Sequence, residues 1–267
     1  MVHITNVNIN TNKINNSKKI LVISDLHLTR DKGFKHLDEI KHTVLSDEIS
    51  EIIIPGDIYN DVNELKNKHF RDKSLQVLWD FAQRRQVFVS LGNHDLMTKT
   101  NSGWKKGDVS LMEEAFQDLP NFYLIHNGEQ LRYDSISYSA FSPDFTYYED
   151  EKKSRKDLES ESDYEESFME NYNPSLFDKN AFNIFLTHEP QSIIKLSTKK
   201  GSCIQDNTDL VISGHMHDGM VPHTLKRFSN NTGFISPQKQ FFPSYAHGTV
   251  KINGTTFIIN GPVNALV

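Results

Sequence analysis

Short apolar runs alternate with longer amphipathic stretches through the first ninety residues of the chain. The runs Lys19–Ser24, Glu51–Pro55 and Gln86–Leu91 are rich in β-branched residues and predict buried strands. Between them, Gly33–Glu48 and His69–Arg84 place apolar residues every three to four positions, which is the spacing of an amphipathic helix. Because strands and helices alternate, the pattern predicts an α/β domain built on parallel strands.

A hairpin signal follows near the C-terminal end. Thr249–Ile252 and Thr255–Asn260 are strand-like runs that flank Asn253-Gly254. Both residues of an Asn-Gly pair tolerate a positive φ, so the pair is a strong signal for a two-residue β-hairpin. The pattern therefore adds an antiparallel edge to the predicted parallel strands.

A long polar stretch at about residues 142–180 separates two strand-like runs, Ile136–Ala140 and Phe182–Leu186. Its middle, Glu149–Glu170, contains ten acidic and four basic residues, a net charge of 4 − 10 = −6. Long loops in compact domains are often functional, so the stretch could form a lid over a site. Charge runs usually lie in solvent, and a solvated, partly helical excursion is the favoured alternative.

Polar motifs stand where the predicted strands end. They are Asp25-Leu26-His27, Gly56-Asp57, Gly92-Asn93-His94-Asp95, Thr187-His188 and Gly214-His215-Met216-His217. Because an open α/β sheet gathers the carboxyl ends of its strands along one edge, residues distant in sequence can converge there. Oxygen from Asp and Asn with nitrogen from His, and no thiolate, is a ligand set suited to manganese, iron or zinc. The motifs together predict a two-metal site.

These motifs, in this order, resemble the complete signature of the calcineurin-like metallophosphoesterases. The resemblance covers roughly residues 19–267, and chance assembly of all five motifs after strands is improbable. The run Gly214–Pro222, followed by Gly233–Pro237, is similar to the bacterial phosphodiesterase-like branch of that superfamily. The resemblance implies a four-layer α/β/β/α sandwich of two mixed β-sheets flanked by helices, within a single domain over residues 1–267.

Taken residue by residue, the resemblance implies two divalent or trivalent metal ions, with manganese the ion expected in vitro. The first would be bound by Asp25, His27, Asp57 and His217, and the second by Asp57, Asn93, His188 and His215. Asp57 would bridge the two ions, and a shared hydroxide would attack phosphorus. The resemblance also implies that His94 protonates the leaving group while Asp95 orients the His94 imidazole.

Composition and charge narrow the function classes. The 267 residues carry a net charge of −6, and no basic tract is longer than a pair such as Lys18-Lys19. A broad nucleic-acid surface is therefore not expected. The single Cys203 fits a reducing compartment. Neither a secretory signal nor an apolar run of transmembrane length stands out, so we expect a cytoplasmic protein.

We therefore expect a hydrolase that cleaves a phosphodiester, or a phosphomonoester, of a small phosphorylated substrate, with a nucleotide as one candidate. Two alternatives remain, a non-catalytic scaffold of the same fold and a nuclease. Such scaffolds typically lose the catalytic histidine, which is present here as His94. A nuclease would be marked by a basic groove.

Two further segments each have two interpretations. Thr98–Gly107 contains Trp104 beside lysines, which suits a nucleotide or sugar-nucleotide substrate, but a polar loop flanked by glycines ordinarily lies in solvent. Phe241-Phe242 lies in an otherwise polar loop and could contact a membrane. Paired aromatic residues more often pack inward, which is the favoured expectation for this pair.

Overall fold

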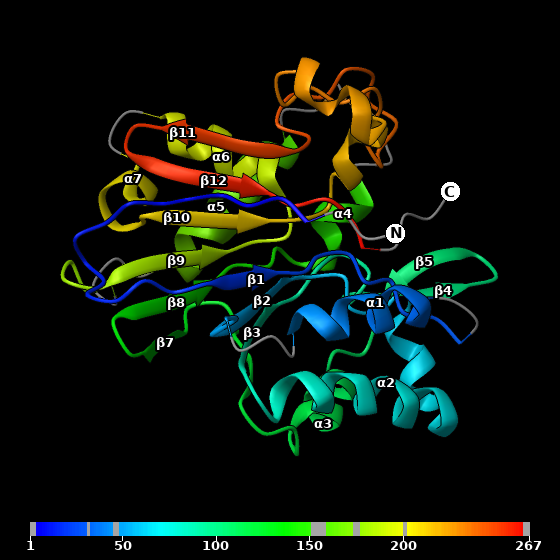
Figure 1. The fold of residues 1–267 in the computed structure, drawn as a ribbon. Helices are drawn as coiled ribbons and strands as arrows, with labels where there is room; N and C mark the ends of the chain where they lie inside the picture. Colours follow the sequence, from blue (N-terminus) through cyan, green and yellow to red (C-terminus); the bar gives the residue numbers. More distant parts are fainter. Residues whose placement is uncertain are drawn as a thin grey trace.

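Two main β-sheets with helices on their outer sides form the structure (Figure 1). The computed structural model describes residues 4–30, 33–44, 48–150, 159–172, 177–199 and 202–263. The strands are β1 (Ile20–Val22), β2 (Glu51–Pro55), β3 (Gln86–Ser90), β4 (Met97–Thr100), β5 (Gly103–Lys106), β6 (Phe122–Leu124), β7 (Gln130–Tyr133), β8 (Ile136–Ala140), β9 (Phe182–Leu186), β10 (Leu210–Ser213), β11 (Gly248–Ile252) and β12 (Thr255–Ile259). Within the described residues, no helix is long and apolar enough to span a membrane.

Helices occupy most of the connections between strands. The α-helices are α1 (Phe34–Val44), α2 (Lys68–Ala82), α3 (Ser110–Phe116), α4 (Phe145–Asp150), α5 (Glu159–Asn171), α6 (Pro190–Thr198) and α7 (Cys203–Asn207). The 3₁₀ turns are η1 (Val62–Lys66), η3 (His217–Met220) and η4 (His223–Phe228). The two predicted N-terminal helices are confirmed as α1 and α2.

The first sheet has the order β1-β2-β3-β6, and all its described neighbours pair in parallel. Helices α1 and α2 make the crossovers between β1, β2 and β3, so the predicted β-α-β-α-β order is confirmed. The resemblance implied two mixed sheets. This sheet is parallel instead, because each of its strands is reached by a crossover from the same end.

The second sheet is mixed and has the order β11-β12-β10-β9-β8-β7. Its inner pairs are parallel, whereas β11 with β12 and β8 with β7 are antiparallel. The predicted hairpin is confirmed at its edge, where Asn253 has a φ of 48° and Gly254 a φ of 98°. The α/β fold class is confirmed by this combination of sheets and helices.

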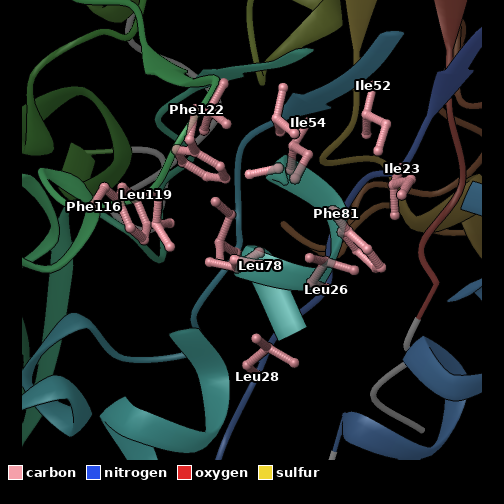
Figure 2. Packing of buried hydrophobic residues seen from close by; sticks show 14 of the residues in the cluster. Ile23, Leu26, Leu28, Ile52, Ile54, Leu78, Phe81, Phe116, Leu119 and Phe122 are labelled. Carbon is pink, nitrogen blue, oxygen red and sulfur yellow. The ribbon is translucent and has the colours of Figure 1, made fainter. Parts of the chain in front are cut away.

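Alternate residues of the strands pack into different hydrophobic clusters. In β2, Ile53 joins residues of the second sheet such as Ile184 and Ile212, whereas Ile54 joins the cluster beneath α2. Figure 2 shows Leu78 and Phe81 of α2 in that cluster. The faces of the second sheet alternate in the same way, with its other side packed on residues of α5 and α6. The two sheets therefore face each other. Within each sheet, the C-terminal ends of the parallel strands lie at the same edge.

The acidic stretch at about residues 142–180 is partly packed. Tyr164 and Phe168 of α5 are buried, and their rings lie 5.3 and 5.2 Å from the ring of Phe141. A fully solvated excursion therefore does not describe α5. Residues 151–158 and 173–176 lie outside the described ranges, and a lid role for the stretch stays a prediction.

The segment Thr98–Gly107 is not an irregular loop. Its residues form most of an antiparallel hairpin of β4 and β5, in which Lys99 pairs with Trp104. Most of these residues are exposed, as the solvent interpretation expects, and the paired ones satisfy their backbone groups within the hairpin. The Lys106 ammonium also lies 3.0 Å from the Asp144 carboxylate, which ties the hairpin to the chain just before α4.

Candidate metal centre

The predicted ligands converge at the C-terminal ends of the strands. Asp25 and His27 follow β1, Asp57 follows β2, Asn93 follows β3, His188 follows β9, and His215 and His217 follow β10. Five of these seven residues have a positive φ, with values of 53° at Asp25, 43° at His27, 55° at Asp57, 68° at His215 and 47° at His217. Non-glycine residues rarely occupy this left-handed region, and such strain clusters at functional sites.

Two glycines allow the turns after β2 and β3 to approach closely. Gly56 has a φ of 90°, and a Cβ atom there would lie 2.7 Å from the Gly92 backbone and from Nδ1 of His188. A Cβ atom on Gly92 would collide with the carboxylate of Asp57. The glycines in the Gly-Asp and Gly-Asn-His-Asp motifs are therefore required by close packing around the ligands.

Asp25 lies at the centre of the first group of ligands. Its Oδ1 atom is 3.3 Å from Nε2 of His217 and 3.8 Å from Nε2 of His27. The Nε2 atoms of these two histidines are 3.1 Å apart. The three residues form one of the groups whose ligand atoms lie within 4.8 Å of one another. They match three of the four ligands expected for the first metal ion.

Asp57 lies between the two expected metal positions. Its Oδ2 atom is 3.7 Å from Nε2 of His27 and 3.1 Å from Nε2 of His188. Its Oδ1 atom accepts a hydrogen bond from the backbone N–H of His94 at 2.8 Å. One carboxylate oxygen is therefore held by the backbone, and the other lies near one ligand from each expected set.

The remaining two ligands contact each other. Oδ1 of Asn93 is 2.9 Å from Nδ1 of His215, and both residues are buried. The other ring nitrogen of His215 contacts the side-chain amide of Gln238. Sequence reasoning did not identify Gln238, which lies 23 residues further along the chain and belongs to no ligand motif. The structure thus adds one residue that can hold the His215 ring in position.

The donor set and its burial fit a metal site. Asp25 and Asp57 are buried, and their ion-pair contacts in the described part of the chain all involve histidine. Nδ1 of His188 lies 2.8 Å from the Pro55 carbonyl, whereas its Nε2 is buried without a hydrogen bond of acceptable geometry. Buried carboxylates need a compensating cation, so an ion bound among these atoms would satisfy them.

The pKa values of the buried Asp and His side chains also fit a metal site. Burial alone would raise the pKa of Asp25, but the hydrogen bond from His217 and the charge of His188 lower it to about 2. Burial opposes protonation of His188, yet the carboxylates of Asp57 and Asp25 raise its pKa to about 10. Without a metal ion, a proton on His188 therefore compensates the buried negative charge. Metal binding would displace that proton, because a ligating imidazole must be neutral.

The His94 ring lies beside the ligands, and its hydrogen bond goes to a backbone carbonyl and not to a ligand side chain. Its Nδ1 atom is 2.8 Å from the carbonyl oxygen of Asn60. Its ring centroid is 4.8 Å from that of His27 and 5.1 Å from that of Trp104. His27, Asp57 and His94 also form a group of closely spaced possible ligands, so distance alone does not separate His94 from the metal-binding residues.

The expectation that Asp95 orients the His94 ring was wrong. Asp95 is fully buried, and its carboxylate accepts hydrogen bonds from the backbone N–H groups of Asp57, Gly92 and Tyr59 at 2.7, 2.9 and 3.1 Å. The Asn60 carbonyl takes the expected place beside Nδ1 of His94. Asp95 therefore holds the turns after β2 and β3 together, and it acts on the site through their backbone.

Asp95→Asn is expected to lower the free energy of unfolding. Either orientation of the amide sets its NH₂ group against backbone donors, and leaving buried donors unsatisfied costs about 1–3 kcal/mol. Urea unfolding followed by circular dichroism measures this loss. Asp118→Asn, the same change at an exposed position, is the control and should leave the midpoint unchanged. An unchanged midpoint for Asp95→Asn, with reduced turnover, would restore the orienting role.

A family model described as calcineurin-like phosphoesterase matches residues 18–219, a range that contains every predicted ligand together with His94. The chain belongs to the calcineurin-like phosphoesterase family. Its sequence is also 24% identical over 241 residues to a probable cyclic nucleotide phosphodiesterase of Coxiella burnetii, an alignment that covers 85% of this chain and 87% of that protein. Family and relative together support a metal-dependent hydrolase that acts on phosphoesters.

Solved structures of similar shape include two enzymes. A dimetal phosphatase from Danio rerio has a TM-score of 0.49 and 10% identity, over 91% of this chain and 87% of that chain. Phosphopantetheinyl hydrolase from Mycobacterium tuberculosis has a TM-score of 0.45 and 14% identity, over 91% of this chain and 89% of that chain.

Proposed function

We propose that this member of the family is a binuclear phosphodiesterase for small phosphorylated molecules. The observation that carries the proposal is the position of Asp57 Oδ2, 3.7 Å from His27 and 3.1 Å from His188. A carboxylate oxygen placed between two imidazoles suits a ligand shared by two cations. One ion would be bound by Asp25, His27, Asp57 and His217, and the other by Asp57, Asn93, His188 and His215.

Manganese, iron or zinc would fit these oxygen and nitrogen donors. The bound ions would supply a hydroxide nucleophile at neutral pH and neutralise charge on the phosphoryl oxygens. The chain itself orients the donors. Ser24 hydrogen-bonds Oδ2 of Asp25, the Pro55 carbonyl selects the His188 tautomer whose Nε2 is available, and Gln238 contacts His215.

His94 is the residue we assign to protonation of the leaving group. The Asn60 carbonyl lies 2.8 Å from Nδ1, so it can accept a hydrogen bond from an N–H there. This leaves Nε2 to exchange a proton with substrate. The backbone N–H of His94 also donates to Asp57 Oδ1 at 2.8 Å. The position of the proposed acid is thereby coupled to the position of the proposed bridging ligand.

Aromatic and basic residues beside His94 favour a nucleotide-like substrate. The Trp104 ring lies 5.1 Å from the His94 ring, and Lys99 pairs with Trp104 across the β4–β5 hairpin. The Tyr148 ring of α4 lies 6.0 Å from the His215 ring. An indole face can stack on a base and a lysine can contact phosphate. The named activity of the Coxiella relative makes cyclic nucleotides the first substrates to test.

Activity screening of metal-reconstituted protein tests the proposal. We expect turnover of bis-p-nitrophenyl phosphate and of at least one cyclic nucleotide, and slower turnover of p-nitrophenyl phosphate. Single-stranded and double-stranded DNA should be cleaved poorly, because the chain carries a net charge of −6. Preferred cleavage of DNA would replace the proposal with a nuclease. Two bound ions without turnover of any ester would favour a non-catalytic scaffold. The cytoplasmic location of the protein stays a prediction.

A further inference from the structure

Exposed apolar side chains gather in one segment after the ligand motifs. Residues 220–247, here called the aromatic lobe, run from the last residue of η3 to the residue before β11 and stand beyond the ends of β10 and β12 (Figure 1). Six of the eleven exposed large hydrophobic residues found among the described residues belong to it, namely Met220, Leu225, Phe228, Phe234, Phe241 and Phe242. The family match ends at residue 219, so the lobe lies outside it.

The lobe is an ordered frame that presents these side chains outward. The Phe234 N–H donates to the Gly219 carbonyl at 2.7 Å, and the Phe242 N–H donates to the Phe234 carbonyl at 3.0 Å. At its base, the Ser229 hydroxyl is 2.7 Å from Nε2 of His247, and the Ala246 N–H donates to the Asn231 carbonyl at 2.7 Å. The outward rings are therefore held by backbone contacts and not by an unfolded loop.

The expectation that Phe241 and Phe242 pack inward was wrong. Their exposed fractions are 71% and 70%, and that of Phe228 is 68%. The inward positions of the lobe are taken by smaller residues such as Ser236 and Ala246, which are buried. Exposing several large apolar side chains within one short segment is unfavourable in water, and it indicates that the segment meets a partner surface.

The charge of the lobe indicates what this surface meets. The lobe contains Lys226, Arg227 and Lys239 and no acidic residue, a formal net charge of +3. Lys226 forms an ion pair with Asp218 just before the lobe, so Arg227 and Lys239 carry most of the positive charge that the lobe presents. The remaining residues carry −6 − 3 = −9. The Arg227 guanidinium lies 4.6 Å from the Phe228 ring, so one basic group accompanies an exposed aromatic side chain directly. Apolar rings accompanied by basic groups are typical of segments that insert at an anionic lipid interface.

We propose that the aromatic lobe docks on an anionic phospholipid surface. Phe228, Phe241 and Phe242 would enter the headgroup boundary, and Arg227 and Lys239 would meet lipid phosphates. A two-fold pairing of the lobe with a second copy is disfavoured, because it would set Arg227 and Lys239 against the same basic residues of the other copy. The contact of Gln238 with His215 places the same segment against the metal centre, so the docked lobe would hold that centre near the lipid surface.

Vesicle co-sedimentation of the full chain tests this docking. We expect binding to vesicles of phosphatidylcholine with phosphatidylglycerol, weak binding to phosphatidylcholine alone, and weaker binding as salt is raised. The double variant Phe241→Ser/Phe242→Ser should bind about 10-fold or more weakly, since two rings no longer enter the interface. Its turnover of a soluble ester and its circular dichroism should equal those of the unaltered chain, because neither ring belongs to the metal centre.

Matched variants separate docking from general effects. Trp79→Ser removes an exposed aromatic ring from α2 and should leave vesicle binding unchanged. Arg227→Glu/Lys239→Glu should weaken binding, whereas Lys66→Glu/Lys68→Glu, an equal change of charge elsewhere, should have little effect. Three results would overturn the proposal. The first is no retention of the unaltered chain on anionic vesicles, and the second is equal retention of the Phe variant. The third is a chain that does not bind vesicles and that light scattering shows to be a dimer, which the Phe variant dissociates. Retention of the protein on vesicles is measured without any substrate being turned over. The docking proposal can therefore be contradicted while the proposed phosphodiesterase activity is confirmed.

Discussion

Asp57→Asn is expected to abolish turnover and to bring the metal content below two ions per chain. The amide oxygen can keep the hydrogen bond from the His94 backbone, which is 2.8 Å long for Asp57 Oδ1. The NH₂ group then replaces Oδ2 between His27 and His188, the position that a shared ligand would occupy. Because an amide nitrogen is a donor without negative charge, several kcal/mol of charge stabilisation is lost, a fall of about 1000-fold or more in kcat/KM.

Elemental analysis and kinetics on the same preparation measure this effect. Asp72→Asn makes the same chemical change at an exposed position of α2 and should retain both ions and full turnover. The fold of Asp57→Asn should persist, because its backbone hydrogen bond is conserved in the amide. Full occupancy with unchanged turnover would show that Asp57 is not a shared ligand.

His94→Ala is expected to keep the metal ions and to lose rate in a way that depends on the leaving group. General acid catalysis contributes about 10²–10⁴-fold, and it matters most for a poor leaving group. The variant should therefore lose far more rate on an alkyl phosphodiester than on a p-nitrophenyl ester, because the p-nitrophenolate leaving group departs without protonation. His69→Ala, at an exposed position of α2, is the matched control and should behave like the unaltered chain.

Metal analysis of His94→Ala and its rates on the two esters decide between two roles of His94 that the geometry permits. His94 is grouped by distance with His27 and Asp57, as a ligand would be, yet the Asn60 carbonyl lies beside its Nδ1 atom, which suits an acid. Retained metal with unequal losses on the two esters would establish the acid. Loss of a metal ion, or equal losses on both esters, would show instead that His94 holds the site together.

Much of the fold follows from local pattern. The alternation of apolar runs and amphipathic stretches predicted β1, α1, β2, α2 and β3, because strand and helix periodicities differ and can be recognised in a short window. The Asn253-Gly254 pair predicted the hairpin of β11 and β12, because its two positive φ values are a local property. The short hairpin at Trp104 was not predicted from the sequence, because its strands have too few residues to show a pattern of apolar and polar positions.

The ligand motifs were also readable in the sequence, since polar residues directly after strands converge at one edge of a sheet. The partners of Asp95 and the contact of Gln238 with His215 could not be read there. Each joins residues from different elements, and the register between those elements depends on how the turns pack around Gly56 and Gly92.

The sequence by itself therefore determined the fold class, the family and the candidate metal ligands, because these depend on periodicity and on residue types at strand ends. The tertiary structure decided which atoms meet. It turned Asp95 toward four backbone N–H groups, placed the Asn60 carbonyl beside His94, and left Phe241 and Phe242 exposed. The direction of a side chain at a turn is set by packing against residues far along the chain, and no local pattern carries that information.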